Sequence, residues 1–134
     1  MSEENVEIVR RAYVALSQGA EDTLREMAAP EFVVDFSRRL VEPAVLRGSN
    51  EALAALGQIR EPWDDWPVWE PQELIDAGDK VLAFIRTTAR GKGSGVEVEA
   101  HVWNLWTIRD GKLVELTYFG DDRAAALKAA GLSK

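Results

Sequence analysis

Hydrophobic and polar residues alternate most regularly between Gly95 and Phe119, where the chain reads GVEVEAHVWNLWTIRDGKLVELTYF. Successive side chains of a strand point to opposite faces, so this pattern predicts a long strand, a tight turn at Asp110-Gly111 and a returning strand. One face of the long strand carries Val96, Val98, Ala100, Val102, Asn104, Trp106 and Ile108. The other face carries Glu97, Glu99, His101, Trp103, Leu105 and Thr107.

Asn104 is the single amide on the otherwise apolar face of this strand. Burial of an amide without hydrogen-bond partners costs roughly 1–3 kcal/mol in proteins, so a polar group at this place needs a reason. The amide either lines a pocket or is satisfied by neighbouring polar atoms.

The earlier part of the chain shows the spacing of helices. An apolar stripe predicts a first helix that begins near Ser2 and ends at Gly19. The stripe consists of Val6, Val9, Tyr13 and Leu16. A second, short helix is expected to stop at Pro30, and a third is expected to begin near Ser49 and to end at Pro62.

Further strands are predicted beside these helices. Residues Glu31–Phe36 alternate so that Phe32, Val34 and Phe36 share one face and Val33 and Asp35 share the other. Residues 37–48 have no such pattern and are predicted to form a loop. Two longer strands, near Val68–Ala77 and Val81–Arg90, are joined by a Gly78-Asp79 turn, which is a strong hairpin signal.

The order of elements predicts the class of fold. Three helices with one early strand precede an antiparallel meander, and a small helix is predicted at Arg123–Ala130. Helices grouped before strands indicate an α+β fold in which the helices cover one face of the sheet. We therefore expect a curved antiparallel sheet wrapped around three N-terminal helices, with a pocket between the two layers.

Composition narrows the classes of function. A chain of 134 residues is expected to form a single domain over residues 1–134. Its net charge of −7 argues against nucleic acid or an anionic membrane as a general partner, and the absence of cysteine excludes disulfides and thiolate chemistry. The acidic start of the chain does not resemble a signal peptide, and no apolar run approaches a membrane span. A cytoplasmic location is expected.

The chain resembles the SnoaL-like branch of the nuclear transport factor 2-like superfamily, which also includes ketosteroid isomerases. The segments that carry the resemblance are Glu7–Leu16 with Gly19, Phe32–Phe36, Arg47-Gly48, Ala77–Phe84 and Thr107–Leu116. The resemblance implies a cone, a curved sheet around an open-ended cavity with a cystatin-like fold, and a homodimer formed through the sheet. Fold alone does not decide the chemistry of such a protein.

The resemblance also implies a site. Tyr13 is similar to the isomerase tyrosine that donates a hydrogen bond to a developing enolate oxygen, and Asp35 is similar to the isomerase general base. Counting back from the Asp110-Gly111 turn places Asn104 where isomerases and polyketide cyclases usually carry a catalytic aspartate. Asparagine can donate a hydrogen bond but cannot titrate, so acid–base chemistry from this position is lost.

Each of these residues also has a purely structural interpretation. Asp35 is a base in an aromatic pocket, a surface carboxylate on a half-exposed strand, or a partner for Arg38 or Arg39. Tyr13 is either an oxyanion donor or an ordinary core aromatic.

Other side chains are candidates for ligand contacts. His101, the single histidine, is an acid–base candidate or a residue of a dimer interface on the sheet, and ideal alternation places it opposite Asn104. Arg86 could bind an anionic group or face solvent. Aromatic contacts to a flat ligand are expected from Trp63, Trp106 and Tyr118. A single histidine and no cysteine make a zinc site improbable, and no cofactor is expected.

Three functional hypotheses follow. The first is a protein that binds a small hydrophobic molecule and acts as a cofactor-independent isomerase or cyclase by proton transfer next to a carbonyl. The second is a non-catalytic ligand-binding or protein-interaction module, which the asparagine at position 104 favours. The third is dehydratase or epoxide-hydrolase chemistry in the same pocket, with Asp35 or His101 activating water.

Overall fold

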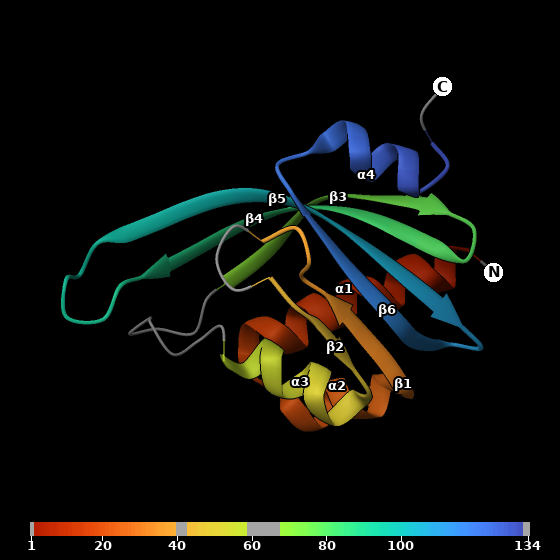
Figure 1. Ribbon diagram of the computed structural model, residues 1–134, viewed down its shortest axis with the longest axis horizontal. Helices are drawn as coiled ribbons and strands as arrows, with labels where there is room; N and C mark the ends of the chain where they lie inside the picture. Colours follow the sequence, from red (N-terminus) through yellow and green to blue (C-terminus); the bar gives the residue numbers. More distant parts are fainter. Residues whose placement is uncertain (1, 40–42, 59–67, 133–134) are drawn as a thin grey trace.

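The computed structural model describes residues 2–39, 43–58 and 68–132 (Figure 1). These residues form four helices and six strands. In chain order the elements are α1 (Ser2–Gln18), α2 (Glu21–Met27), β1 (Ala28–Asp35), β2 (Val45–Arg47), α3 (Ser49–Gln58), β3 (Val68–Ala77), β4 (Lys80–Arg90), β5 (Glu97–Arg109), β6 (Lys112–Gly120) and α4 (Arg123–Ala129). The α+β class predicted from the sequence is confirmed.

The strands form one mixed sheet in the order β2-β1-β6-β5-β4-β3. Strands β3 to β6 pair antiparallel, as predicted, but β1 runs parallel to β6, with Val33 opposite Glu115 and Val34 opposite Leu116. The prediction of an entirely antiparallel sheet is therefore wrong. Residue alternation defines the faces of a strand, but it does not specify which strand lies beside it or in which direction.

Two local predictions around β1 are also corrected. Residues 37–48 are not all loop, because Val45–Arg47 form β2 and pair antiparallel with Val33–Asp35. Strand β1 begins at Ala28 rather than Glu31 and contains Pro30. Proline has no N–H for the ladder, and the pairing of β1 with β6 shifts register between Ala28 and Val33, where the proline is tolerated.

The two predicted hairpin turns are confirmed. Ala77 pairs with Lys80 across the Gly78-Asp79 turn, and Arg109 pairs with Lys112 across the second turn. In the second turn Asp110 has a φ of 53° and Gly111 a φ of 75°. Two consecutive positive φ values match the tight hairpin turn whose twist suits the flanking strands, and Asp-Gly is a favoured pair for it.

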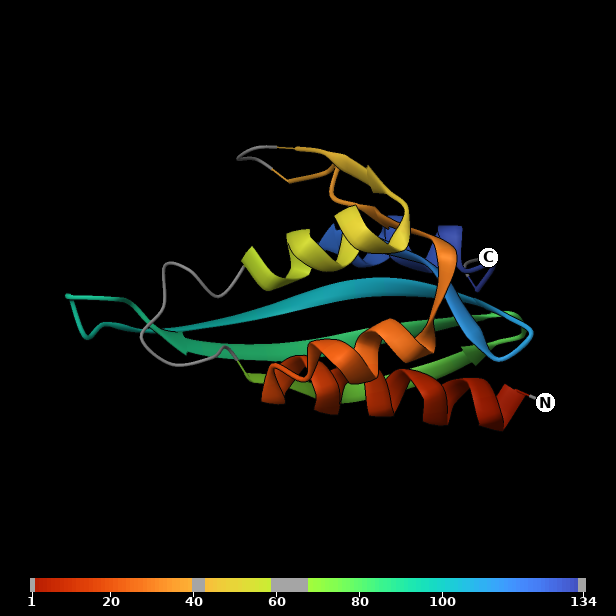
Figure 2. The ribbon, with the colours of Figure 1, turned by 90° about the horizontal axis from the view of Figure 1, so that it is seen from below.

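Helices α1, α2 and α3 lie on one face of the sheet, below the strands in Figure 1, and α4 lies against the other face, above them. In the view from below (Figure 2), α2 and α3 are in front and α4 is behind. The first face holds the larger core, which includes Val9, Tyr13, Phe32, Ile85, Trp106 and Leu113. On the second face α4 covers Leu82, Trp103, Leu105 and Phe119 with Ala126 and Ala130. Both faces of the central strands are thus buried over part of their length.

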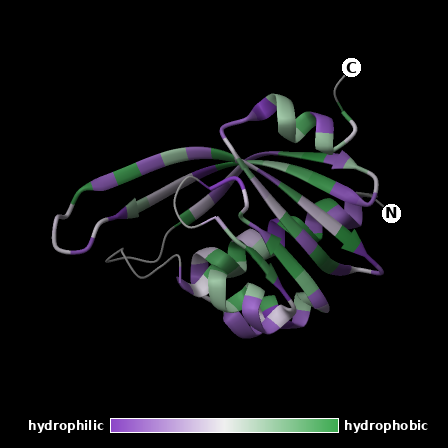
Figure 3. Cartoon of the chain, in the orientation of Figure 1, coloured by the Kyte–Doolittle hydropathy of each residue, from purple (hydrophilic) through white to green (hydrophobic). Residues whose placement is uncertain are grey.

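The far ends of β4 and β5 extend beyond these helices as a long hairpin (Figure 1). Figure 3 shows hydrophobic and hydrophilic bands alternating along this part of β5. Val96 and Val98 are 58% and 43% exposed there. The alternation that predicted the strand therefore continues past the region in which helices cover it.

No helix among the described residues has the length and apolar character that a membrane crossing requires. The same residues hold no group of three or more histidine, aspartate or glutamate side chains arranged to bind a metal ion.

Ser17 fastens α1 to the edge strand β3. Its hydroxyl accepts a hydrogen bond from the Trp69 backbone N–H at 2.9 Å and donates one to the Trp69 backbone oxygen at 3.3 Å. One side chain thus joins residues 52 positions apart in the chain and holds Trp69 in place.

Ser17→Ala is expected to lower the free energy of unfolding by about 1–3 kcal/mol, because two partly buried backbone groups lose this partner. Urea denaturation followed by circular dichroism measures the change. Ser94→Ala is the matched control, since Ser94 also accepts from one backbone N–H (Val96) and donates to one backbone oxygen (Gly91), but in an exposed turn. The control should change stability by less than about 0.5 kcal/mol. Equal effects of the two substitutions would contradict this assignment.

Candidate functional site

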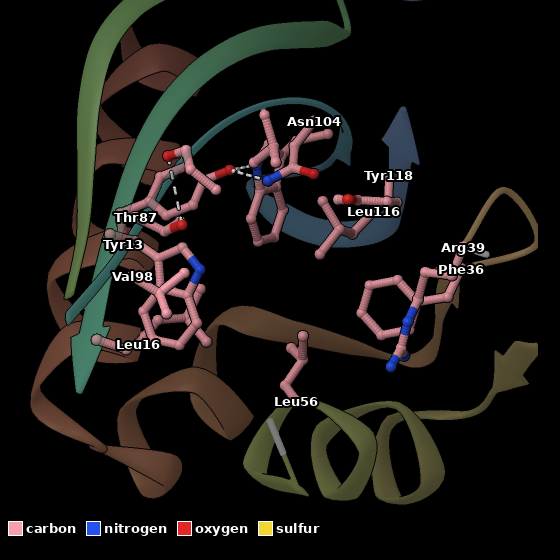
Figure 4. A pocket seen from close by; sticks show the side chains of 15 residues that line it. Tyr13, Leu16, Phe36, Arg39, Leu56, Thr87, Val98, Asn104, Leu116 and Tyr118 are labelled. Atoms are coloured by element: carbon pink, nitrogen blue, oxygen red, sulfur yellow. Dashed lines mark hydrogen bonds between the residues drawn. The ribbon is translucent and has the colours of Figure 1, made fainter. Parts of the chain in front are cut away.

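A cavity of about 300 Å³ lies between the inner face of the sheet and the helices (Figure 4). Its walls are mainly aliphatic and aromatic, with a few polar groups. The lining residues are Tyr13, Leu16, Phe36, Arg39, Leu56, Trp69, Thr87, Ala89, Val98, Ala100, Val102, Asn104, Trp106, Leu116 and Tyr118. A volume of this size lies at the lower end of the range for small-molecule sites.

Three polar side chains meet at one end of the cavity. The Tyr13 hydroxyl oxygen accepts hydrogen bonds from Asn104 Nδ2 at 2.9 Å and from Trp106 Nε1 at 2.8 Å (Figure 4). The Tyr13 and Trp106 rings pack edge to face, with their centroids 5.4 Å apart. Tyr13 is 1% exposed and Asn104 is 7% exposed, so this cluster is almost entirely withdrawn from water.

The positions of Tyr13, Asn104 and Trp106 within their own helix and strand explain why they come together. Tyr13 lies on the apolar stripe of α1, together with Val9 and Leu16, and therefore faces the sheet. Asn104 and Trp106 are two residues apart on β5 and therefore share a face. The prediction that this face carries one amide among apolar residues is confirmed, and the cavity wall from Val98 to Trp106 is that face.

The arrangement leaves a defined set of free hydrogen-bonding groups. A phenol oxygen can accept two hydrogen bonds and donate one, and both acceptor positions of Tyr13 are occupied by N–H groups. Its proton is therefore available to a molecule in the cavity. The Asn104 oxygen points away from Tyr13, towards the side that Tyr118 lines (Figure 4), and has no hydrogen-bond partner among the residues that the structure describes. The Tyr13 proton and the Asn104 oxygen are thus both available to a ligand at this end of the cavity.

Burial also determines the protonation state of this donor. Desolvation raises the pKa of the Tyr13 phenol well above its ordinary value of 10.0, and the hydrogen bonds from Asn104 and Trp106 offset only part of that rise. Tyr13 is consequently a neutral phenol across the physiological range, and it can donate its proton in a hydrogen bond.

Asp35 does not join this cluster. Its neighbours Val34 and Phe36 are buried on the core side of the sheet, and alternation turns Asp35 to the other side. Its Oδ1 accepts a hydrogen bond from the Ser37 backbone N–H at 2.9 Å, and it is not among the cavity-lining residues. Asp35 and Tyr13 therefore do not converge on this cavity, and the role of Asp35 as a general base stays a prediction.

Arg86 and His101 lie opposite each other on β4 and β5, on the face away from the cavity. Arg86 bridges Glu70 and Glu99, at 2.8 Å to each, and its hydrogen bond and charge lower the pKa of Glu99. His101 lies 3.9 Å from Glu99 and stacks on Phe84. Arg86 and His101 thus lie outside the lining of this cavity. Their roles as ligand contacts stay predictions, as does a homodimer through this face.

The remaining predicted contacts divide into two groups. Trp106 and Tyr118 line the cavity, as Asn104 does, and Tyr118 lies directly opposite Asn104 on the neighbouring strand. Trp63 falls within residues 59–67, outside the described residues. The ligand-contact roles of Asn104, Trp106 and Tyr118 stay predictions.

Sequence reasoning missed two polar residues of the cavity. Thr87 lies on β4 with its neighbours Ile85 and Ala89 on the same face, and that alternation could have identified it. Arg39 lies in the loop after β1, where no periodic pattern indicates direction. The sequence indicates Arg39 only as a partner for Asp35, because its position at the cavity depends on the path of this loop.

A second, smaller cavity of about 200 Å³ lies between α1, α2 and α3. It is lined by Leu16, Gly19, Glu21, Leu24, Leu53, Leu56 and Gly57. Leu16 and Leu56 line both cavities, so these two side chains belong to the partition between them.

Comparisons with known proteins agree with this architecture. The model of the SnoaL-like domain family matches residues 9–116. A protein from Jannaschia sp. CCS1, provisionally named a SnoaL-like polyketide cyclase, is 25% identical with a TM-score of 0.77, covering 100% of this chain and 95% of its own. A provisionally named polyketide cyclase from Sinorhizobium meliloti is 27% identical with a TM-score of 0.69, covering 84% of this chain and 94% of its own.

Other solved structures share the fold at lower identity. Bal32a, from a soil-derived mobile gene cassette, is 20% identical with a TM-score of 0.80, covering 90% of this chain and 92% of its own. A search of curated proteins found no match.

The raised pKa of Tyr13 leads to a titration prediction. The chain has two tyrosines, so in the Tyr118→Phe variant any tyrosinate absorbance comes from Tyr13. The folded variant should show no tyrosinate absorbance near pH 10, whereas the urea-unfolded variant should ionise there. Half-ionisation near pH 10 with the circular dichroism spectrum unchanged would contradict the buried phenol.

The raised pKa of Tyr13 also determines how the stability of the protein changes with pH. Above about pH 10 the unfolded chain releases the Tyr13 proton while the folded chain keeps it, so the folded state binds more protons. The free energy of unfolding therefore decreases as the pH rises above about 10, and below that pH Tyr13 causes no such decrease.

Proposed function

Because the chain belongs to the SnoaL-like domain family, we propose that it binds a small hydrophobic carbonyl compound in the cavity lined by Tyr13 and Asn104. The observation that supports this most directly is the free Tyr13 O–H, held by two N–H groups at the end of an apolar cavity. A ligand carbonyl oxygen is a natural acceptor for that proton, and a ligand hydroxyl or N–H could donate to the Asn104 oxygen.

The apolar walls favour a flat ligand. The aromatic side chains at the cavity are Tyr13, Phe36, Trp69, Trp106 and Tyr118. Burial of a fused-ring surface among them would contribute the larger part of the affinity, and the polar end would fix the orientation. Aromatic ketones of the polyketide type belong to this chemical class.

The described lining residues favour binding over acid–base catalysis. They include no aspartate, glutamate or histidine, and Asn104 cannot titrate in the range where proteins are folded. Proton abstraction beside a carbonyl needs a base within hydrogen-bond reach of the carbon-bound proton. Binding without conversion is therefore the function that the geometry supports best.

A matched pair of ligands tests the donor. 9-Fluorenone and fluorene have nearly the same shape, but only the ketone can accept a hydrogen bond from Tyr13. Native protein should bind the ketone about tenfold more tightly than the hydrocarbon, as expected for one buried hydrogen bond. Titration calorimetry or tryptophan fluorescence measures both dissociation constants.

Tyr13→Phe should abolish the preference, so that both compounds bind with similar affinity. The ratio of the two constants controls for any general loss of stability, because an unfolded fraction weakens both ligands equally. A preference that survives in Tyr13→Phe would exclude Tyr13 as the donor, and failure of both compounds to bind native protein would contradict the proposal.

A second candidate is an isomerase or cyclase that moves a proton next to a carbonyl. The provisional polyketide cyclase names of the relatives from Jannaschia and Sinorhizobium, at 25% and 27% identity, favour it. The position of Tyr13 also suits an enolate, because a neutral phenol in a dry site stabilises developing negative charge on oxygen.

Deuterium exchange at the α-carbon of 1-tetralone separates the two candidates. By NMR in D₂O, native protein is expected to leave the exchange rate at the buffer value. Asn104→Asp, which adds a titratable group beside Tyr13, is expected to increase the rate. Exchange catalysed by native protein and lost in Tyr13→Phe would establish the enzyme and contradict the binding proposal.

A further inference from the structure

Arg39 lines the same cavity as Tyr13, from the opposite side of the view in Figure 4. Its side chain is half-buried, and its guanidinium carbon lies 4.7 Å from the centroid of the Phe36 ring. The cavity therefore has a phenol at one end and a cation at the other, with apolar walls between them.

Local structure holds Arg39 in this position. Its backbone N–H donates to the Phe36 oxygen at 3.0 Å and closes a turn after β1. Phe36 is 5% exposed, and its ring packs edge to face on Tyr118 with centroids 6.0 Å apart. The guanidinium thus rests on a buried aromatic support that is itself part of the cavity wall.

Several arginines of the described chain pair with carboxylates, and Arg39 does not. Arg10, Arg25, Arg38 and Arg86 each have a carboxylate within 4 Å: Glu7, Glu21, Asp122, and Glu70 with Glu99, respectively. Among the described residues no carboxylate pairs with Arg39, and it is the single charged side chain of the described cavity wall.

We propose that Arg39 is the anion-binding residue of this cavity and that the ligand is an organic carboxylate. This rests on the proposed function, to which it adds the charge of the ligand. The planar guanidinium can donate two parallel hydrogen bonds to a carboxylate, and such charge-assisted pairs are roughly twice as strong as neutral ones. The ligand would place its carbonyl at Tyr13, its flat body against the aromatic wall and its carboxylate at Arg39.

The overall charge of the protein makes this selectivity depend on Arg39. A net charge of −7 repels anions at a distance, so general electrostatic attraction does not favour a carboxylate ligand. The apolar surroundings of the cavity weaken screening and strengthen a local pair. Selective binding of a carboxylate would therefore depend on Arg39, the charged side chain of the described cavity wall.

The test compares 9-fluorenone-2-carboxylate with 9-fluorenone-2-carboxamide, which keeps the shape but removes the charge. Native protein should bind the carboxylate about 10- to 100-fold more tightly, and Arg39→Gln should reduce that ratio to near one. Arg38→Gln is the matched control, because Arg38 is the adjacent residue, lies over Phe119 and pairs with Asp122 instead. The control should keep the native ratio, and circular dichroism should show the same fold for all three proteins.

Each alternative result has a separate meaning. Equal binding of carboxylate and carboxamide by native protein would overturn the role of Arg39 while leaving the carbonyl-binding function intact. An equal loss of selectivity in Arg38→Gln would also overturn it, because general charge would then explain the preference. If native protein binds neither these compounds nor 9-fluorenone, both proposals fail.

Discussion

Two N–H groups buried in an apolar interior must have acceptors, and in this protein one phenol oxygen supplies both. Asn104 and Trp106 come from β5, and Tyr13 comes from α1, more than 90 positions earlier in the chain. A buried donor without a partner costs about 1–3 kcal/mol, so the first helix is held at one rotation and one height on the sheet. The shape of the cavity follows from that placement, since the same helix supplies Leu16 to its wall.

Strand β5 contributes different kinds of side chains to its two faces. Towards α1 it presents the cavity wall and the polar cluster, and towards α4 it presents Trp103 and Leu105 to a second core. Further along the outer face, Glu99 and Arg86 form an exposed ion-pair network with Glu70. Because side chains alternate between the two faces, Arg86, Glu99 and His101 of the sheet lie on the face away from the cavity.

The spacing of apolar residues predicted those features of the fold that depend only on residues close together in the chain. The hairpin turns, the apolar stripe of α1 and the faces of β5 follow from spacing alone, and the structure has them where the sequence indicates. Alternation in β1 also places Asp35 on the face opposite Phe32, Val34 and Phe36, which occupy the core side. The resemblance of Asp35 to a family base rests on its position along the strand, which does not specify the face.

Other features depend on distant partners and could not be predicted from spacing. The parallel pairing of β1 with β6 is decided by how the meander returns across the sheet. The contact of Tyr13 with Asn104 depends on the packing of a helix on that sheet. Arg39 lies in a loop, where its direction depends on a turn closed by the Phe36 oxygen and on contact with the Phe36 ring.

The partition formed by Leu16 and Leu56 has an evolutionary consequence. It separates two spaces of about 300 and 200 Å³, and neither leucine takes part in the polar cluster. A smaller residue at position 56 could join the two spaces while Tyr13, Asn104 and Arg39 kept their places. A lineage of such proteins could therefore change the size of its ligands by single substitutions in a helix, with the groups that orient the ligand inherited unaltered.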